Sequence, residues 1–217
     1  GRQLATGGSF WDSTVQIWDA EKRELIQTLR GHIREVTSIA FSPDGSTAIS
    51  GAADNLIILW DVQSGREIQR FEAGNTPFTL AFSPDGNLLA AAPNMQRAAD
   101  ESEQMPREEL VIRIWDLDSG AGRTLGRDID QTRYLGFVED RRLLWVGRHV
   151  DADEVVEKIF DLEDGTIDVL AEGGREWHRV IGQQRTSQLT MKPKGSDIES
   201  EVELFFTNLE TGEVRQI

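Results

Sequence analysis

Three residues of the sequence have the side chains of a hydrolytic triad: His32, Ser50 and Asp54. A serine nucleophile, a histidine base and an aspartate that orients the histidine carry out acyl transfer when a fold brings them together. The surroundings of Ser50 do not favour this chemistry, because the serine is not on a strained nucleophile turn and no loop offers oxyanion-hole donors. We therefore assign no catalytic residue.

A second group of polar residues suggests a metal site: His149, Asp151, Asp153 and Glu154. Oxygen ligands at alternate positions suit calcium, and an imidazole suits zinc. The glycine-containing spacing of a calcium loop is absent, so we interpret the segment as a solvated acidic loop and predict no metal. The sequence also has no phosphate-binding glycine loop or dinucleotide fingerprint, so we predict no cofactor.

The composition narrows the possible partners. The 217 residues include 23 basic and 38 acidic ones, a formal net charge of −15. This charge repels phosphate groups and argues against nucleic acid and anionic lipid as partners. No apolar run approaches the ~20 residues that a membrane-spanning helix needs. The absence of cysteine excludes disulfides, a cysteine-ligated zinc and a thiol nucleophile.

The elements that position these residues repeat along the chain. Phe-Ser-Pro-Asp-Gly occurs at 41–45 and again at 82–86, and an apolar run followed by a short turn recurs about every 43 residues. The pairs that end these apolar runs are Trp18-Asp19, Trp60-Asp61, Trp115-Asp116, Phe160-Asp161 and Thr207-Asn208.

Each repeat predicts four short strands and no helix. In the second repeat, the alternation of apolar and polar residues predicts strands over 36–41, 47–51, 56–60 and 67–71. Between the first two of these strands, Pro43, Asp44 and Gly45 have the chemistry of a tight turn. The polar segment 96–109 is interpreted as a loop. The sequence therefore predicts an all-β protein.

Four strands per repeat, with Trp-Asp closing the third, resemble the WD-repeat family of β-propellers, bacterial members included. The resemblance implies four-stranded antiparallel blades, about five of them, in one propeller domain over 1–217. It is strong through Asp116 and weak from Gly173 onward, where Trp-Asp has become Thr-Asn. The expected units are 1–32, 33–74, 75–128, 129–173 and 174–217.

The first blade is expected to be incomplete. Gly1 aligns with Gly45 and Gly86, each of which follows the innermost strand of its repeat. The innermost strand of the first blade is then missing, and we expect the chain to be a fragment of a larger propeller. An arc of blades would expose open strand edges.

The resemblance also implies a structural role for the triad-like residues. In the family, a histidine before the first strand, a serine on the second, an aspartate in the next turn and a tryptophan on the third form a hydrogen-bonded set, and His32, Ser50, Asp54 and Trp60 match these positions. Burying a carboxylate is costly unless such partners satisfy it. The first repeat retains a partial set, namely Thr6, Asp12 and Trp18.

The resemblance implies a non-catalytic scaffold that binds a protein or peptide, which the acidic charge suggests is basic. The alternatives are a regulatory propeller tail of a larger enzyme of kinase or protease type, or a propeller enzyme with a central-channel site. We expect a cytoplasmic location and leave the oligomeric state open. The expected binding face combines the insertion at 93–109 with Trp11, Arg34, Phe78, Arg133, Asp151, Asp153 and Trp177.

Overall fold

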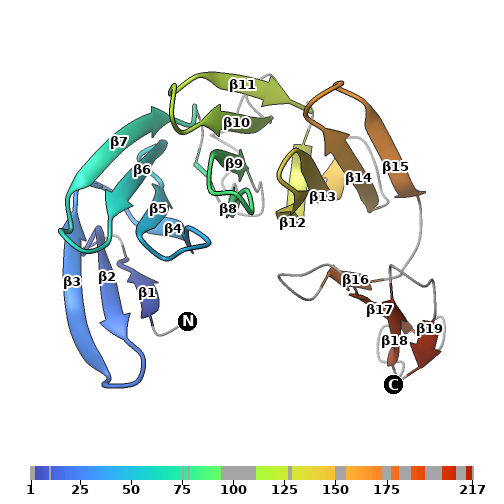
Figure 1. The fold of residues 1–217 in the computed structure, drawn as a ribbon, viewed down its shortest axis with the longest axis horizontal. Coiled ribbons are helices and arrows are strands. Elements are labelled where there is room, and N and C mark those ends of the chain that lie inside the picture. The colour runs from blue at the N-terminus through green and yellow to red at the C-terminus, as the bar shows by residue number, and fades with distance from the viewer. Residues whose placement is uncertain are drawn as a thin grey trace. The chain divides into compact units, whose positions relative to one another are not determined.

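The fold consists of β-strands joined by turns (Figure 1). The computed structural model describes residues 3–9, 11–74, 76–77, 79–93, 111–126, 129–149, 155–172, 177–180, 187–193, 202–208 and 214–216. Side chains are described as far as residue 169, apart from 129–131 and 149. These residues form 19 strands and no helix. The chain divides into two units, Gly1–Leu170 and Ala171–Ile217.

The first unit contains four antiparallel sheets, which we call blades 1 to 4. Blade 1 has three strands: β1 (Gln3–Gly7), β2 (Thr14–Asp19) and β3 (Glu24–Arg30). Blade 2 has β4 (Val36–Phe41), β5 (Thr47–Ala52), β6 (Leu56–Asp61) and β7 (Glu67–Glu72). Blade 3 has β8 (Thr79–Phe82), β9 (Leu88–Ala92), β10 (Ile112–Asp116) and β11 (Gly122–Leu125). Blade 4 has β12 (Ile129–Glu139), β13 (Arg142–His149), β14 (Val156–Asp161) and β15 (Ile167–Glu172).

The second unit is one four-stranded antiparallel sheet. Its strands are β16 (Trp177–Val180), β17 (Ser187–Pro193), β18 (Val202–Asn208) and β19 (Val214–Gln216). The predicted all-β fold of four-stranded blades with an incomplete first blade is thus confirmed. In blade 2, the last three strands each end one residue later than the sequence predicts. The five unit boundaries stay a prediction.

The turn between the first two strands of a blade is built by the repeated Ser-Pro-Asp-Gly. In blade 2 the Ser42 hydroxyl accepts the backbone N–H of Thr47 at 3.0 Å, and Asp44 Oδ1 accepts the N–H of Ser46 at 3.0 Å. Gly45 has a φ of 74°, in the left-handed region that favours glycine. Blade 3 repeats these bonds with Ser83 and Asp85, so one local sequence produces one local structure.

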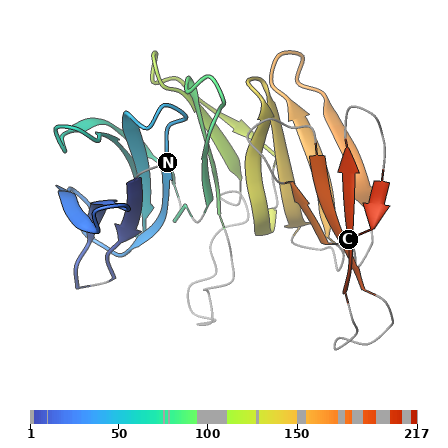
Figure 2. The ribbon, with the colours of Figure 1, turned by 60° about the horizontal axis from the view of Figure 1, so that its bottom comes forward.

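Within the first unit, successive blades lie side by side. The first strands β4, β8 and β12 are neighbours, and the last strands β7, β11 and β15 lie on the outer side (Figure 1). Figure 2 shows the strands of these blades running alongside one another. Each sheet therefore has a neighbour against which an apolar face can pack.

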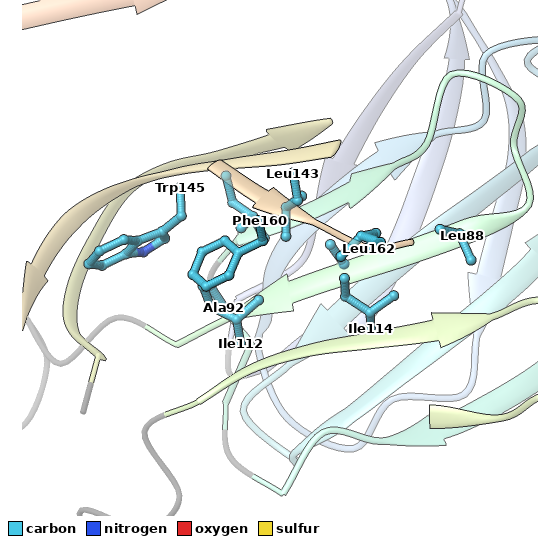
Figure 3. Packing of buried hydrophobic residues seen from close by; sticks show 10 residues of the cluster. Leu88, Ala92, Ile112, Ile114, Leu143, Trp145, Phe160 and Leu162 are labelled. Carbon is cyan, nitrogen blue, oxygen red and sulfur yellow. The ribbon is translucent and has the colours of Figure 1, made fainter. Parts of the chain in front are cut away.

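The hydrophobic core lies between these blades, in one cluster for each interface. Figure 3 shows the cluster between blades 3 and 4, where Ile112 and Ile114 on β10 meet Leu143, Trp145 and Phe160. These five side chains are at most 3% exposed. Burying one such side chain contributes about 1.5–3 kcal/mol, so packing between blades is the main stabilising term.

Candidate functional site

The structure brings His32, Ser50, Asp54 and Trp60 together in blade 2. Ser50 lies on β5 and Trp60 on β6, whereas His32 precedes β4 and Asp54 lies in the β5–β6 turn. His32 Nδ1 is 3.0 Å from Asp54 Oδ2, and His32 Nε2 is 2.8 Å from Ser50 Oγ. Trp60 Nε1 donates to the same Ser50 Oγ at 2.8 Å. Four elements of one blade are therefore joined by a single hydrogen-bond chain.

The side chains at the two ends of this hydrogen-bonded set have fixed donor and acceptor roles. The indole of Trp60 can only donate, and the carboxylate of Asp54 can only accept. Ser50 accepts from Trp60, and its hydroxyl can donate to His32 Nε2 when that nitrogen carries no proton. The other ring nitrogen of His32 then donates to Asp54.

Asp54 also fixes the backbone on both sides of the site. Oδ2 accepts the N–H of Ile33 at 3.1 Å, and Oδ1 accepts the N–H of Leu56 at 3.1 Å. The first of these bonds holds the loop that enters β4, and the second holds the start of β6. With its side chain only 2% exposed, the carboxylate depends on these partners for the solvation it loses by burial.

The order of contacts is that of a hydrolytic triad, yet the site cannot receive a substrate. Ser50 is 0% exposed, and the side chain of His32 is 1% exposed. The Ser50 oxygen that would attack a substrate already contacts Trp60. A nucleophile must reach the carbonyl carbon of its substrate, so this geometry supports a structural role.

The partial set in blade 1 has different contacts. Trp18 Nε1 donates to Thr6 Oγ1 at 3.1 Å, which matches the Trp60–Ser50 bond. Asp12 Oδ1 accepts the hydroxyl of Thr14 at 2.8 Å. Thr6 and Asp12 are exposed, unlike their counterparts Ser50 and Asp54.

Three of the predicted binding residues have described side chains. Trp11, in the β1–β2 turn, is 90% exposed, and Arg34, just before β4, is also exposed. The N–H of Val36, the first residue of β4, donates to the carbonyl of Gly8 at 3.1 Å, which joins the start of β4 to the β1–β2 turn. Arg133 is exposed on β12.

Other predicted binding residues have no described side chain. Phe78, Asp151, Asp153 and residues 94–109 of the insertion lie outside the described residues, and Trp177 is placed only as the first residue of β16. The acidic loop at 151–154 therefore stays a prediction.

Sequence reasoning missed one exposed apolar side chain beside these loops. Ile33 is 80% exposed, although its backbone is held by Asp54. No local signal in the sequence identifies it, because the exposure of Ile33 depends on tertiary packing.

Sequence reasoning also missed a buried polar contact in blade 4. Trp145 Nε1 donates to Thr132 Oγ1 at 3.2 Å, and Trp145 is 0% exposed. Trp145 lies on the second strand of its blade, whereas Trp60 lies on the third. The motif-based comparison therefore could not find it.

The aspartate of each Trp-Asp or Phe-Asp pair orders the turn that follows. Asp61 Oδ1 accepts the N–H of Ser64 at 2.6 Å, and Asp116 Oδ1 accepts that of Ser119 at 2.8 Å. Hydrogen bonds from the Ser64 side chain and backbone lower the pKa of Asp61. Those from the backbone and side chain of Ser119 lower the pKa of Asp116. These carboxylates act as local turn acceptors.

In the described part of the chain, no group of three or more His, Cys, Asp or Glu residues is arranged to hold a metal ion. No helix of sufficient length and apolarity to cross a membrane occurs among the same residues.

Comparison with known proteins identifies one repeat directly. Residues 23–61 match the family model "WD domain, G-beta repeat". Small ribosomal subunit protein RACK1y of Oryza sativa subsp. japonica is 34% identical over 109 residues, which are 50% of this chain and 28% of that protein. Cross-pathway control WD-repeat protein 2 of Flammulina velutipes is 38% identical over 155 residues, 62% of this chain and 45% of that protein. The chain thus spans less than half the length of these relatives.

A solved structure shares the fold at low sequence identity. The Kuenenia stuttgartiensis hydrazine synthase structure superposes with a TM-score of 0.65 at 17% identity. The match covers 95% of this chain and 60% of that one. At this identity the likeness shows the fold alone.

Proposed function

Because this chain belongs to the WD-repeat family, we propose that it is a non-catalytic scaffold that binds a protein or peptide partner through loops on one face of its blades. The observation that carries the proposal is a pair of exposed apolar side chains, Trp11 and Ile33. Trp11 lies in the β1–β2 turn, which is bonded to the start of β4, and Ile33 lies in the loop that enters β4, with its N–H bonded to Asp54 of the buried site.

Rigid presentation supports a binding role for these loops. Trp11 and Ile33 are 90% and 80% exposed, and the loop that carries Ile33 is held by Asp54. A side chain presented by a fixed backbone loses little conformational entropy on binding. Loops on a rigid scaffold are also where binding residues concentrate.

A non-catalytic role is supported by the burial of the triad-like set, since Ser50 and His32 cannot contact a substrate. The names of the two relatives describe a ribosomal-subunit protein and a control protein rather than an enzyme. The alternatives are a regulatory tail on a larger enzyme and an enzyme with a central-channel site. The complete gene sequence, together with activity assays of its product, would distinguish both from a non-catalytic scaffold.

We propose that the partner contains a basic segment. The chain has a net charge of −15, which accelerates the approach of a basic segment and does so less at high salt. The acidic loop at Asp151 and Asp153 and the insertion at 93–109 would supply carboxylates, while Trp11 and Ile33 supply apolar contact. Arg34, Phe78 and Arg133 complete the proposed face, and Trp177, in the second unit, is proposed as a separate candidate.

The test measures partner binding by the complete protein. Partners are captured, identified by mass spectrometry and purified, and their Kd is measured for the wild type and for Trp11→Ala, Ile33→Ala and a variant with a shortened 93–109 insertion. We expect each substitution to weaken binding about tenfold, which corresponds to about 1.4 kcal/mol.

The matched control is Ile68→Ala, which removes a 53% exposed side chain on β7, outside these loops. It should leave Kd unchanged, and all variants should keep the wild-type Tm. Unchanged Kd values for the three loop variants, in folded protein, would show that this face does not bind the partner.

A further inference from the structure

The chain contains a Trp-Asp pair that does not end a strand. Trp-Asp occurs at 11–12, 18–19, 60–61 and 115–116. The last three pairs end β2, β6 and β10, and each aspartate accepts a backbone N–H of the turn that follows. Trp11 and Asp12 lie instead in the β1–β2 turn, and both residues are exposed. This pair therefore presents an indole and a carboxylate together to solvent.

The backbone of the β1–β2 turn is closed by its own hydrogen bonds. The N–H of Asp12 donates to the carbonyl of Ser9 at 2.9 Å. The N–H of Gly8 donates to the carbonyl of Thr14 at 2.8 Å. The chain folds back so closely that a Cβ on Gly8 would lie 1.5 Å from the carbonyl oxygen of Asp12. Together with the bond from Val36 to Gly8, these contacts hold the turn in one conformation.

The carboxylate of Asp12 is oriented but can accept further hydrogen bonds. Its Oδ1 accepts the hydroxyl of Thr14 at 2.8 Å, and Thr14 is 6% exposed. An ionised carboxylate has about four acceptor positions, so Asp12 can still accept two parallel N–H bonds. The counterpart Asp54 differs, because it is buried and already binds His32 and two backbone N–H groups.

An indole and a carboxylate on consecutive residues match the chemistry of an arginine side chain. Tryptophan is the aromatic side chain that binds a cation best. A guanidinium is planar and weakly hydrated, so it can stack on an indole while its N–H groups donate to a carboxylate. A lysine ammonium is compact and strongly hydrated, and it gains less from an exposed indole. Consecutive Cα atoms lie about 3.8 Å apart, so one partner side chain can reach both groups.

We propose that Trp11 and Asp12 bind an arginine side chain of the partner, with the guanidinium stacked on the indole and paired with the carboxylate. This inference rests on the proposed binding role of the β1–β2 turn, and it names the residue by which the basic segment of the partner is recognised. The net charge of −15 favours the approach of a cation to this turn. The closed backbone reduces the entropy that the turn loses on binding.

The experiment measures the binding of a defined peptide to the complete protein. The probe is acetyl-Ala-Ala-Arg-Ala-Ala-amide, and two matched peptides carry lysine or citrulline in place of arginine. The indole N–H signal of Trp11 and the backbone amide signal of residue 12 are followed by NMR during each titration at low salt. We expect saturable shifts with the arginine peptide, a Kd about threefold higher with lysine and a Kd about tenfold higher with uncharged citrulline.

Protein variants test the two groups separately, and the amide signal of residue 12 reports on all of them. Trp11→Phe keeps an aromatic face and should raise the Kd about twofold, whereas Trp11→Leu keeps only apolar surface and should raise it about fivefold. Asp12→Asn keeps an acceptor for the Thr14 hydroxyl but loses the charge, and it should also raise the Kd about fivefold. Because Trp11 and Asp12 are exposed, these variants should keep the wild-type Tm.

The matched control is Asp118→Asn, which removes the same charge from an exposed position in the β10–β11 turn and should leave the Kd unchanged. Equal effects of Asp12→Asn and Asp118→Asn would overturn the proposal, because the net charge alone would then attract the peptide. Equal affinity for the arginine and citrulline peptides, or no saturable shift with arginine, would also overturn it.

The binding role of the turn is tested independently, through the Kd of the captured partner. If Trp11→Ala weakens that partner while the arginine peptide does not bind at the turn, the arginine site is wrong and the binding face remains. If Trp11→Ala leaves the affinity for the partner unchanged in folded protein, the turn does not bind the partner, and the proposal that it binds an arginine of that partner fails with it.

Discussion

Arg123 in blade 3 donates a hydrogen bond from Nη2 to the carbonyl oxygen of Leu162 in blade 4, at 2.8 Å. Gln27 and Gln69 occupy the same register position as Arg123: each lies on the last strand of its blade, opposite a residue of the strand before it. Each of these two glutamines lies against a turn glycine of the next blade, and these glycines are Gly65 and Gly120. One position on the outer strand therefore connects each of these blades to the next, outside the apolar core.

We expect Arg123→Ala to lower the free energy of unfolding by about 0.5–1 kcal/mol. The variant loses one hydrogen bond to a backbone carbonyl, and its exposed location limits the loss. Urea denaturation followed by tryptophan fluorescence measures the change. Arg66→Ala, which removes an exposed arginine from a turn, is the control and should have no effect beyond error. Equal changes in the two variants would argue against the contact with Leu162.

Asp54→Ala should destabilise the protein by about 1–3 kcal/mol. His32 loses its acceptor, and the N–H groups of Ile33 and Leu56 lose theirs, while the site remains buried. Asp12→Ala, at the exposed counterpart in blade 1, should cost much less. Thermal and urea unfolding of both variants provide the comparison, and similar losses would refute the structural role assigned to the blade 2 site.

The tryptophans should differ in their contribution to stability. Trp145→Phe removes the bond to Thr132 and leaves a cavity in a closed cluster, so we expect a loss of about 1–3 kcal/mol. Trp11→Phe should change stability by less than about 0.5 kcal/mol, because Trp11 is 90% exposed. Chemical denaturation measures both. A neutral Trp145→Phe would show that its indole N–H is dispensable.

The Ser-Pro-Asp-Gly turn should stabilise the fold in a pH-dependent way. Hydrogen bonds, first from the Ser42 side chain and then from the Ser46 backbone, lower the pKa of Asp44 from 3.8 to about 2. Because the pKa is lower in the folded state, this contribution is present above pH 3.8 and is lost as the pH falls toward about 2.

The measurement is a carbon-detected NMR titration of the Asp44 carboxyl group. Ser42→Ala should raise its pKa toward 3.8, because the largest cause of the shift is removed. Ser46→Ala should raise it less, since the backbone N–H of residue 46 remains. An Asp44 pKa that does not respond to Ser42→Ala would mean that the turn is held in another way.

The fold was predictable because its signals are local and repeated. Ser-Pro-Asp-Gly at 42–45 specifies a turn through contacts within six residues, and it does so again at 83–86. The alternation in 36–41 and 56–60 likewise depends on neighbouring residues. Blade 4 lacks the Ser-Pro-Asp-Gly turn, and there the contact between Trp145 and Thr132 had no local signature.

The sequence by itself determined the strands, the turns and the four types of side chain at the blade 2 site, because these follow from periodicity and motif spacing. Only the tertiary structure decided that Ser50 is inaccessible, that Ile33 is presented at the surface and that Leu4 is exposed where Ala48 is buried. Exposure depends on which sheet packs against which. That packing joins residues far apart in the chain, so a local sequence pattern cannot predict it.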